Sequence, residues 1–121
     1  LSEARTKGLP TVVWAYPRGG KLSKEGETAL DIIAHSAHLA AQCGAQIVKV
    51  KLPTSHLEDG DAKKVYEKYN IPRATTADCV RHVVQCCFNG KRIVLFSGGP
   101  VKDDDSVLDD ARAIAAGGGF G

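Results

Sequence analysis

Short apolar stretches alternate with longer stretches of mixed polarity along this chain. Residues 11–16, 46–51 and 92–96 are rich in β-branched and aromatic side chains, and proline or glycine residues bound each of them. Bounded apolar runs of this length are typical of buried β-strands. The pattern therefore predicts three strands, each followed by a longer segment.

Apolar residues recur at intervals of three and four in the longer segments, which is the spacing of an amphipathic helix. It predicts one helix over 29–43, ended by Gly44, and another over 61–69. A third helix is expected to start at Thr75 or Thr76 and to bury a stripe formed by Val80, Val83, Val84, Cys87 and Phe88. A last helix is expected to begin at the acidic residues 103–105 and to bury Val107, Leu108, Ala111, Ile114 and Ala115.

The repeated order of strand and helix predicts an α/β fold. Strands that are apolar on both faces belong to a parallel sheet with both faces covered. Three such strands leave two edges unpaired, so we expect further strands outside this sequence. A doubly wound sheet and a (β/α)8 TIM barrel both fit, and both place their chemistry at the C-terminal ends of the strands. These ends fall at 14–20, 49–54 and 97–102.

Composition and charge narrow the class of protein. The chain has 121 residues, of which 43% are apolar and 25% are charged, as in one globular domain. A net charge of +2 gives no support for nucleic-acid binding, and no apolar run approaches the ~20 residues of a membrane span. No basic, apolar and small-residue series opens the chain, so we expect no signal peptide. The chain starts at Leu1, contains no Met and ends in a glycine-rich turn, so we expect a fragment.

The histidines and cysteines do not predict a metal site. His35 and His38 share one face of a predicted helix but lack a third ligand, and His56 and His82 have no evident partner. The four cysteines contain no Cys-x-x-Cys pair, which excludes a zinc ribbon and a thioredoxin motif. We therefore expect no metal, unpaired thiols and a cytoplasmic location.

Two lysines inside the second predicted strand are the most informative feature. The alternation of a strand places Ile47, Lys49 and Lys51 on one face, with Val48 and Val50 on the other. Burial beside a second cation favours the neutral amine of a lysine, which attacks carbonyl groups to form Schiff bases. The alternative is an edge strand with two solvated lysines. The spacing does not choose between a buried and a solvated lysine pair. As the Schiff-base residue it slightly favours Lys51, which lies nearer the C-terminal end of the strand.

Two further groups lie at predicted strand ends. Trp14 and Tyr16 share a strand face, where the tyrosine hydroxyl can act as a general acid or base, and Arg18 can hold an anion. The alternative is an aromatic core pair followed by a solvated arginine. Residues 97–99 precede a helix, a pattern found in phosphate-binding turns and in ordinary turns. Neither a P-loop nor a dinucleotide-binding fingerprint is present.

Three of these segments, in this order, resemble class I fructose-bisphosphate aldolase of the bacterial and archaeal type. They read VWAYPRG at 13–19, GAQIVKVK at 44–51 and SGGP at 97–100. Segments 19–27 and 63–68 also look like the bacterial branch, so the resemblance covers nearly the whole chain. Many relatives carry an acidic or other polar residue in place of Gln46, a difference that we expect to be harmless on an outward face.

The resemblance implies a fold and an activity. The fold would be a (β/α)8 barrel, of which residues 1–121 form one incomplete domain with about strands five to seven. The activity would be reversible cleavage of fructose 1,6-bisphosphate without a metal or cofactor, by a homo-oligomer that binds neither nucleic acid nor membrane. The family's first-strand aspartate and strand-eight Gly-Arg phosphate site lie outside these residues, so this chain alone is expected to be inactive and unstable.

The resemblance also implies roles for individual residues. Lys49 would form the Schiff base, and Tyr16 would donate and accept protons, with Trp14 lining the site. The residues in contact with the phosphorylated sugar would be Arg18, Lys51, Ser97, Gly98 and Gly99. Two alternatives remain open. One is another Schiff-base enzyme on the same barrel, such as a transaldolase-like or aminoheptulosonate-forming relative, and the other is a non-catalytic phosphate-binding α/β domain.

Overall fold

The three predicted strands form one parallel sheet. The computed structural model describes residues 1–97, 99 and 102–121. Its strands, in their order across the sheet, are β1 (Val12–Trp14), β2 (Ile47–Val50) and β3 (Ile93–Phe96). Trp14 pairs with Lys49, and Lys49 pairs with Leu95. The predicted α/β fold with parallel strands is confirmed, and each strand is shorter than its predicted segment.

Helices follow the strands as predicted. Their bounds are α1 (Ser2–Thr6), the 3-10 helix η1 (Gly26–Thr28), α2 (Leu30–Gln42), α3 (Gly60–Lys68), α4 (Thr76–Cys86) and α5 (Asp104–Ala116). Asp59 caps α3, Asp103 caps α5, and Thr75 forms a capping box with Asp78 at the start of α4. These side chains satisfy N–H groups that the first turn of a helix leaves unpaired. The pattern does not predict α1.

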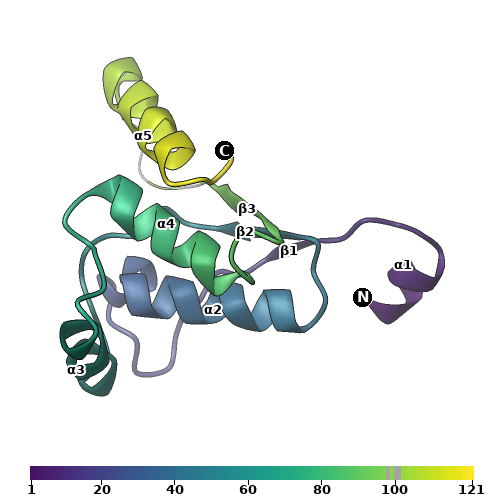
Figure 1. The fold of residues 1–121 in the computed structure, drawn as a ribbon, viewed down its shortest axis with the longest axis horizontal. Helices are drawn as coiled ribbons and strands as arrows, with labels where there is room; N and C mark the ends of the chain where they lie inside the picture. The colour runs from purple at the N-terminus through teal and green to yellow at the C-terminus, as the bar shows by residue number, and fades with distance from the viewer. Residues whose placement is uncertain (98, 100–101) are drawn as a thin grey trace.

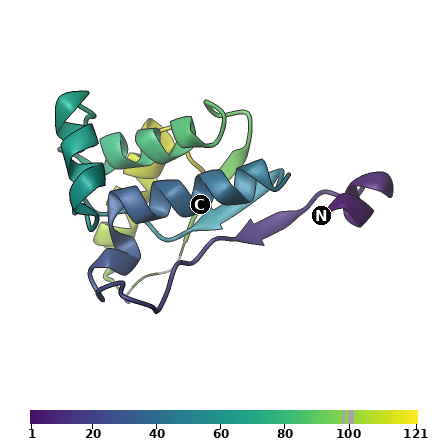
Figure 2. The same cartoon turned by 90° about the horizontal axis from the view of Figure 1, so that it is seen from below.

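The core lies between the sheet and two helices. Helices α2 and α4 lie side by side against one face of the sheet (Figure 1, Figure 2). Val48 and Val50 of β2 are fully buried and share one apolar cluster with Leu30, Ile33 and Val80 of these helices. Full burial of one such side chain stabilises a fold by roughly 1.5–3 kcal/mol. This interface therefore supplies the main stabilisation of the chain.

The opposite face of the sheet is open in this chain. Trp14 is 67% exposed, Val12 is 48% exposed and Ile93 is 43% exposed. The expectation that both faces are covered is wrong for this chain, because α2 and α4 pack on the same face. A cluster of large apolar side chains on a sheet is the kind of surface that further elements cover.

Two predicted helix stripes are buried only in part. Phe88 is 39% exposed because α4 ends at Cys86 and the φ of 56° at Phe88 takes it out of the helical path. Helix α5 approaches α4 through its C-terminal end, where Ile114 is buried and Gly117 lies against Val80. The other predicted stripe residues of α5 are therefore exposed, namely Val107, Leu108, Ala111 and Ala115. In the described part of the chain, no helix combines the length and the apolar character that crossing a membrane requires.

Candidate active site

The three segments singled out in the sequence meet at the C-terminal edge of the sheet. After β1, the amide of Ala15 donates to the carbonyl of Lys49 at 2.9 Å. After β3, the amide of Ser97 donates to the carbonyl of Val50 at 2.9 Å. Both connections thus continue the pairing with the central strand beyond the sheet. This is the edge at which α/β proteins carry their chemistry.

Lys49 projects from the open face of the sheet. Its neighbours Val48 and Val50 are buried under the helices, so strand alternation turns the lysine to the other side, as predicted. The Lys49 ammonium lies 4.5 Å from the centroid of the Trp14 ring. A cation over an aromatic face gains about 0.5–1 kcal/mol at an exposed site. The amine is therefore held against the indole on the central strand of the sheet.

Lys51 has a different environment from Lys49. Its ammonium pairs with the Oε2 atom of Glu27 at 3.0 Å, and the two side chains are only 17% and 15% exposed. Hydrogen bonding from Lys51, with a smaller contribution from Lys24, lowers the pKa of the Glu27 carboxyl. Sequence reasoning missed Glu27, because η1 lies in a connection without the periodicity that marks a residue as facing the strands.

We expect Glu27→Gln to lower the stability of the whole protein at neutral pH, with a deficit that shrinks on acidification. The lowered pKa means that the Glu27 carboxylate stabilises the fold above its ordinary pKa, about 4.5. This stabilisation is lost as the pH falls through the lowered value. Urea midpoints between about pH 7 and pH 3 measure the effect. Glu67→Gln, exposed on α3, is the control, and a deficit that does not change with pH would contradict this assignment.

Tyr16 reaches across the end of the central strand. Its ring stacks on that of Trp14, with centroids 6.3 Å apart and an angle of 26° between the planes. Its hydroxyl donates a long hydrogen bond, 3.4 Å, to the carbonyl of Ser97 after β3. Since β2 lies between β1 and β3, this contact spans the strand that carries Lys49. The fold thus brings Lys49, Trp14 and Tyr16 to one edge.

The structure describes some, but not all, of the other residues predicted to contact the substrate. Ser97 is half-buried at the end of β3, and Gly99 has a φ of 144°, a conformation that favours glycine. Gly98 lies outside the described residues. Arg18 is exposed, and within the described ranges it makes no side-chain hydrogen bond or ion pair. In the described part of the sequence, no hydrogen bond or ion pair therefore links Arg18 to Lys49, Trp14 or Tyr16.

Two of the histidines, His38 and His82, pack within the helical layer. His82 Nε2 lies 2.7 Å from the Tyr66 hydroxyl, and burial lowers the pKa of His82 and raises that of Tyr66. His38 Nδ1 lies 2.7 Å from the carbonyl oxygen of Cys86, whereas His35 is exposed. All three histidines line one cavity between α2, α3 and α4. Among the residues that the structure describes, no three His, Cys, Asp or Glu side chains are grouped so that they could hold a metal ion.

Comparison with known proteins finds related aldolases. A family model described as DeoC/LacD family aldolase matches residues 1–121. The chain is 32% identical over 121 residues to a probable fructose-bisphosphate aldolase class 1 of Chlamydia muridarum. It is also 32% identical over 114 residues to the fructose-bisphosphate aldolase class 1 of Thermoproteus tenax. Each alignment covers 93% of this chain and 34% of the relative, so the chain spans about a third of the length of these relatives.

Solved structures show the same similarity. One is an archaeal fructose-1,6-bisphosphate aldolase whose catalytic lysine is covalently bound to the carbinolamine intermediate of the substrate. It superposes with a TM-score of 0.70 at 29% identity, over 99% of this chain and 38% of that chain. The fructose-bisphosphate aldolase of Slackia heliotrinireducens gives a TM-score of 0.72 at 26% identity, over 98% of this chain and 32% of that chain. The three parallel strands therefore match part of solved aldolase structures.

Proposed function

Because this chain belongs to the DeoC/LacD family of aldolases and is a homologue of class I fructose-bisphosphate aldolases at about 30% identity, we propose that the whole protein cleaves fructose 1,6-bisphosphate through a lysine Schiff base. The products are dihydroxyacetone phosphate and glyceraldehyde 3-phosphate, and the reaction is reversible. The position of Lys49 supports this proposal most directly. Its amine lies on the open face of the central strand beside Trp14, whose ring stacks on that of Tyr16.

Lys49 acts as the nucleophile in this proposal. Its neutral amine attacks the ketone at C2 of the sugar, and loss of water gives an iminium. The iminium takes up the electron pair as the C3–C4 bond breaks and the C4 hydroxyl loses its proton, which leaves an enamine and releases glyceraldehyde 3-phosphate. Protonation at C3 and hydrolysis then release dihydroxyacetone phosphate and restore the amine. Tyr16, or a water that it orients, moves the protons. This route requires neither a metal ion nor a cofactor.

Lys51 has a supporting role. Its ammonium is engaged by Glu27, whereas Lys49 has no carboxylate within ion-pair distance in the described part of the chain. An ammonium held by a carboxylate is not a free nucleophile, so this ion pair favours Lys49, a choice that spacing alone leaves open. Lys51 then contributes positive charge for binding the phosphorylated substrate.

The turn after β3 binds one phosphate of the substrate. The amide of Ser97 already donates to Val50, so Ser97 contacts the phosphate oxygens through its hydroxyl. Gly98 and Gly99 contact them through their N–H groups, and Arg18 supplies a second anion contact. The half-buried position of Ser97, next to the hydroxyl of Tyr16, supports the first of these assignments.

The open face of the sheet becomes the interior of a (β/α)8 barrel. The exposed Trp14, Val12 and Ile93 support this, because the other strands of a barrel would cover them. The three strands then correspond to about strands five to seven, and residues 1–121 form one incomplete domain. The whole protein is a cytoplasmic homo-oligomer in this proposal.

Borohydride trapping of the whole protein tests the proposed function. With dihydroxyacetone phosphate present, reduction should leave a stable adduct on the peptide that contains Lys49, and cleavage of fructose 1,6-bisphosphate should persist in EDTA. An adduct without cleavage of this sugar would indicate another Schiff-base enzyme on the same barrel. A folded protein that gives neither an adduct nor cleavage would indicate a phosphate-binding domain without catalysis.

A further inference from the structure

The carboxylate of Glu58 joins the two connections that follow β1 and β2. Glu58 belongs to the connection between β2 and α3, and its Oε1 atom accepts the amide of Ser23 at 2.9 Å. Its Oε2 atom accepts the hydroxyl of Ser23 at 2.8 Å. Ser23 lies in the connection between β1 and η1, 35 residues earlier in the chain. One side chain therefore links the loop at the end of one strand to the loop at the end of the next.

The backbone that carries Glu58 is itself fixed. The amides of Glu58 and Asp59 donate to the buried carboxylate of Asp31, in the first turn of α2, at 3.1 and 2.9 Å. The amide of Leu30 donates to the carbonyl of His56 at 2.9 Å, two residues before Glu58. The Glu58 carboxylate is therefore a preformed acceptor, and no further ordering of its own backbone is needed for it to hold another segment.

The other half of the contact is built around Ser23 and Gly26. The Ser23 hydroxyl accepts the amide of Gly26 at 2.8 Å while it donates to Glu58. Gly26 is buried, and a Cβ atom at this position would lie 2.5 Å from the Cδ atom of Glu58 and 2.8 Å from both of its carboxylate oxygens. The carboxylate therefore packs directly on the backbone of the segment, in a space that a side chain at position 26 would fill.

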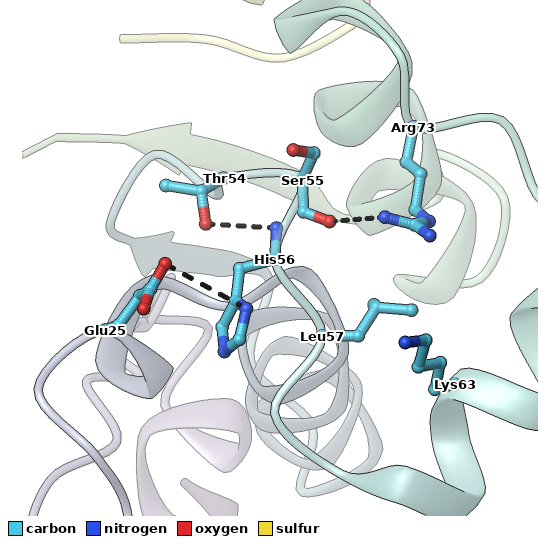
Figure 3. A pocket seen from close by; sticks show the side chains of 7 residues that line it. All are labelled: Glu25, Thr54, Ser55, His56, Leu57, Lys63 and Arg73. Atoms are coloured by element: carbon cyan, nitrogen blue, oxygen red, sulfur yellow. Dashed lines mark hydrogen bonds and ion pairs between the residues drawn. The ribbon is translucent and has the colours of Figure 1, made fainter.

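His56 adds a second contact between the same two connections. Its Nε2 atom lies 3.1 Å from the Oε2 atom of Glu58, and since a carboxylate only accepts hydrogen bonds, Nε2 carries the hydrogen. Its Nδ1 atom lies 4.0 Å from the Oε1 atom of Glu25, which comes from the segment before η1 (Figure 3). The amide of Ser23, followed by the side chains of His56 and Ser23, lowers the pKa of the Glu58 carboxyl. The charged form of Glu58 is therefore the form that makes these contacts.

Segment 17–28 carries residues of the proposed site on both sides of the contact with Glu58. Arg18 precedes the contact in the chain, and Glu27, which pairs with Lys51 at 3.0 Å, follows it directly. Tyr16 is held independently, by stacking on a ring of β1 and by a hydrogen bond to the residue after β3. Loss of the Glu58 contact should therefore affect binding of the phosphorylated substrate more than the proton transfers.

We propose that Glu58 is a positioning residue, whose carboxylate holds segment 17–28 in the conformation that binds the substrate, with Arg18 and Glu27 in place. Its effect on catalysis rests on the proposed function, whereas the contact itself does not. Without the contact, the segment would adopt this conformation for only a fraction of the time, and the apparent affinity for the substrate would fall by that fraction.

Glu58→Ala in the whole protein tests this role. We expect the KM for fructose 1,6-bisphosphate to rise about tenfold and kcat to change by less than about twofold, because saturating substrate restores the segment. Hydrogen exchange at the amides of Ser23 and Gly26 should accelerate about tenfold or more, while the amide of Asp59 keeps its acceptor and its rate. Glu67→Ala, exposed on α3, is the matched control and should change neither measurement.

Gly26→Ala removes the contact by a second route. Its methyl group would take the space of the Glu58 carboxylate and displace the end of this flexible side chain, while the amide at position 26 is kept. The KM should rise as in Glu58→Ala. Combining the two substitutions should add little, because the second one finds the contact already broken.

An unchanged KM in Glu58→Ala would overturn the proposal, as would unaltered exchange at Ser23 and Gly26 or fully additive effects of the two substitutions. If Glu58→Ala loses its native circular dichroism, the KM and the exchange rates of Gly26→Ala decide instead. A failure of the proposed function is distinguishable, because it would remove the borohydride adduct from the unmodified protein. In that case the exchange rates still decide whether Glu58 holds the segment.

Discussion

We expect Lys49→Ala to abolish borohydride trapping in the whole protein and to reduce cleavage of fructose 1,6-bisphosphate by on the order of 10⁴-fold or more. The Lys49 amine lies on the open face of β2, 4.5 Å from the centroid of the Trp14 ring, whereas Glu27 engages the second lysine of this strand. Removing the nucleophile removes the iminium, and with it the electron sink for cleavage. Intact-protein mass spectrometry measures the adduct, and steady-state kinetics measure the cleavage.

Lys51→Ala is the matched control for this experiment. It keeps the amine of Lys49, so the adduct should still form, while loss of a positive charge should raise the KM for the bisphosphate. Circular dichroism of both variants checks that the fold is retained. Near-normal cleavage by Lys49→Ala, or an adduct that tandem mass spectrometry maps to Lys51, would refute the assignment of Lys49.

The face that Lys49 occupies is predictable from the sequence because the signal is local. Val48 and Val50 are β-branched and alternate with the lysines, and only the helix-covered face of β2 can bury them. The start of α4 is predictable for a similar reason, since the Thr75 hydroxyl accepts the amide of a residue only three positions on. Signals of this kind involve neighbours in the chain and need no knowledge of the rest of the fold.

Contacts between connections are not predictable in this way. Glu27 and Lys51 are 24 residues apart, and Arg73 donates to Ser55 across 18 residues. Glu27, Ser55 and Arg73 lie in connections outside the periodicity of the sheet strands and the α-helices, so tertiary packing selects the partners in both contacts. The exposed Trp14 shows a second limit. An apolar pattern indicates that a face is to be buried, but it does not identify the element that buries it.

Tyr16→Phe should separate proton transfer from Schiff-base formation. We expect kcat for cleavage to fall by about 10²–10⁴-fold, the usual contribution of a general acid or base, while dihydroxyacetone phosphate is still trapped on Lys49. Phenylalanine keeps the ring that stacks on Trp14 and removes only the hydroxyl that reaches the carbonyl of Ser97. The KM should change little, because the hydroxyl does not hold a phosphate in the proposed mechanism.

Tyr69→Phe is the matched control, since Tyr69 is 66% exposed after the end of α3 and should leave both measurements unchanged. An unchanged kcat in Tyr16→Phe would exclude this hydroxyl from the proton transfers and assign them to another group or to water. If Tyr16→Phe lost trapping as well as cleavage, the hydroxyl would be required for formation of the carbinolamine. The hydroxyl of Tyr16 spans from β1 to the residue after β3, across the strand of Lys49. A loss of cleavage with trapping intact would therefore assign two separate roles. The amine of Lys49 would form the covalent bond to the sugar, and the hydroxyl of Tyr16 would transfer the protons that cleavage of the C3–C4 bond requires.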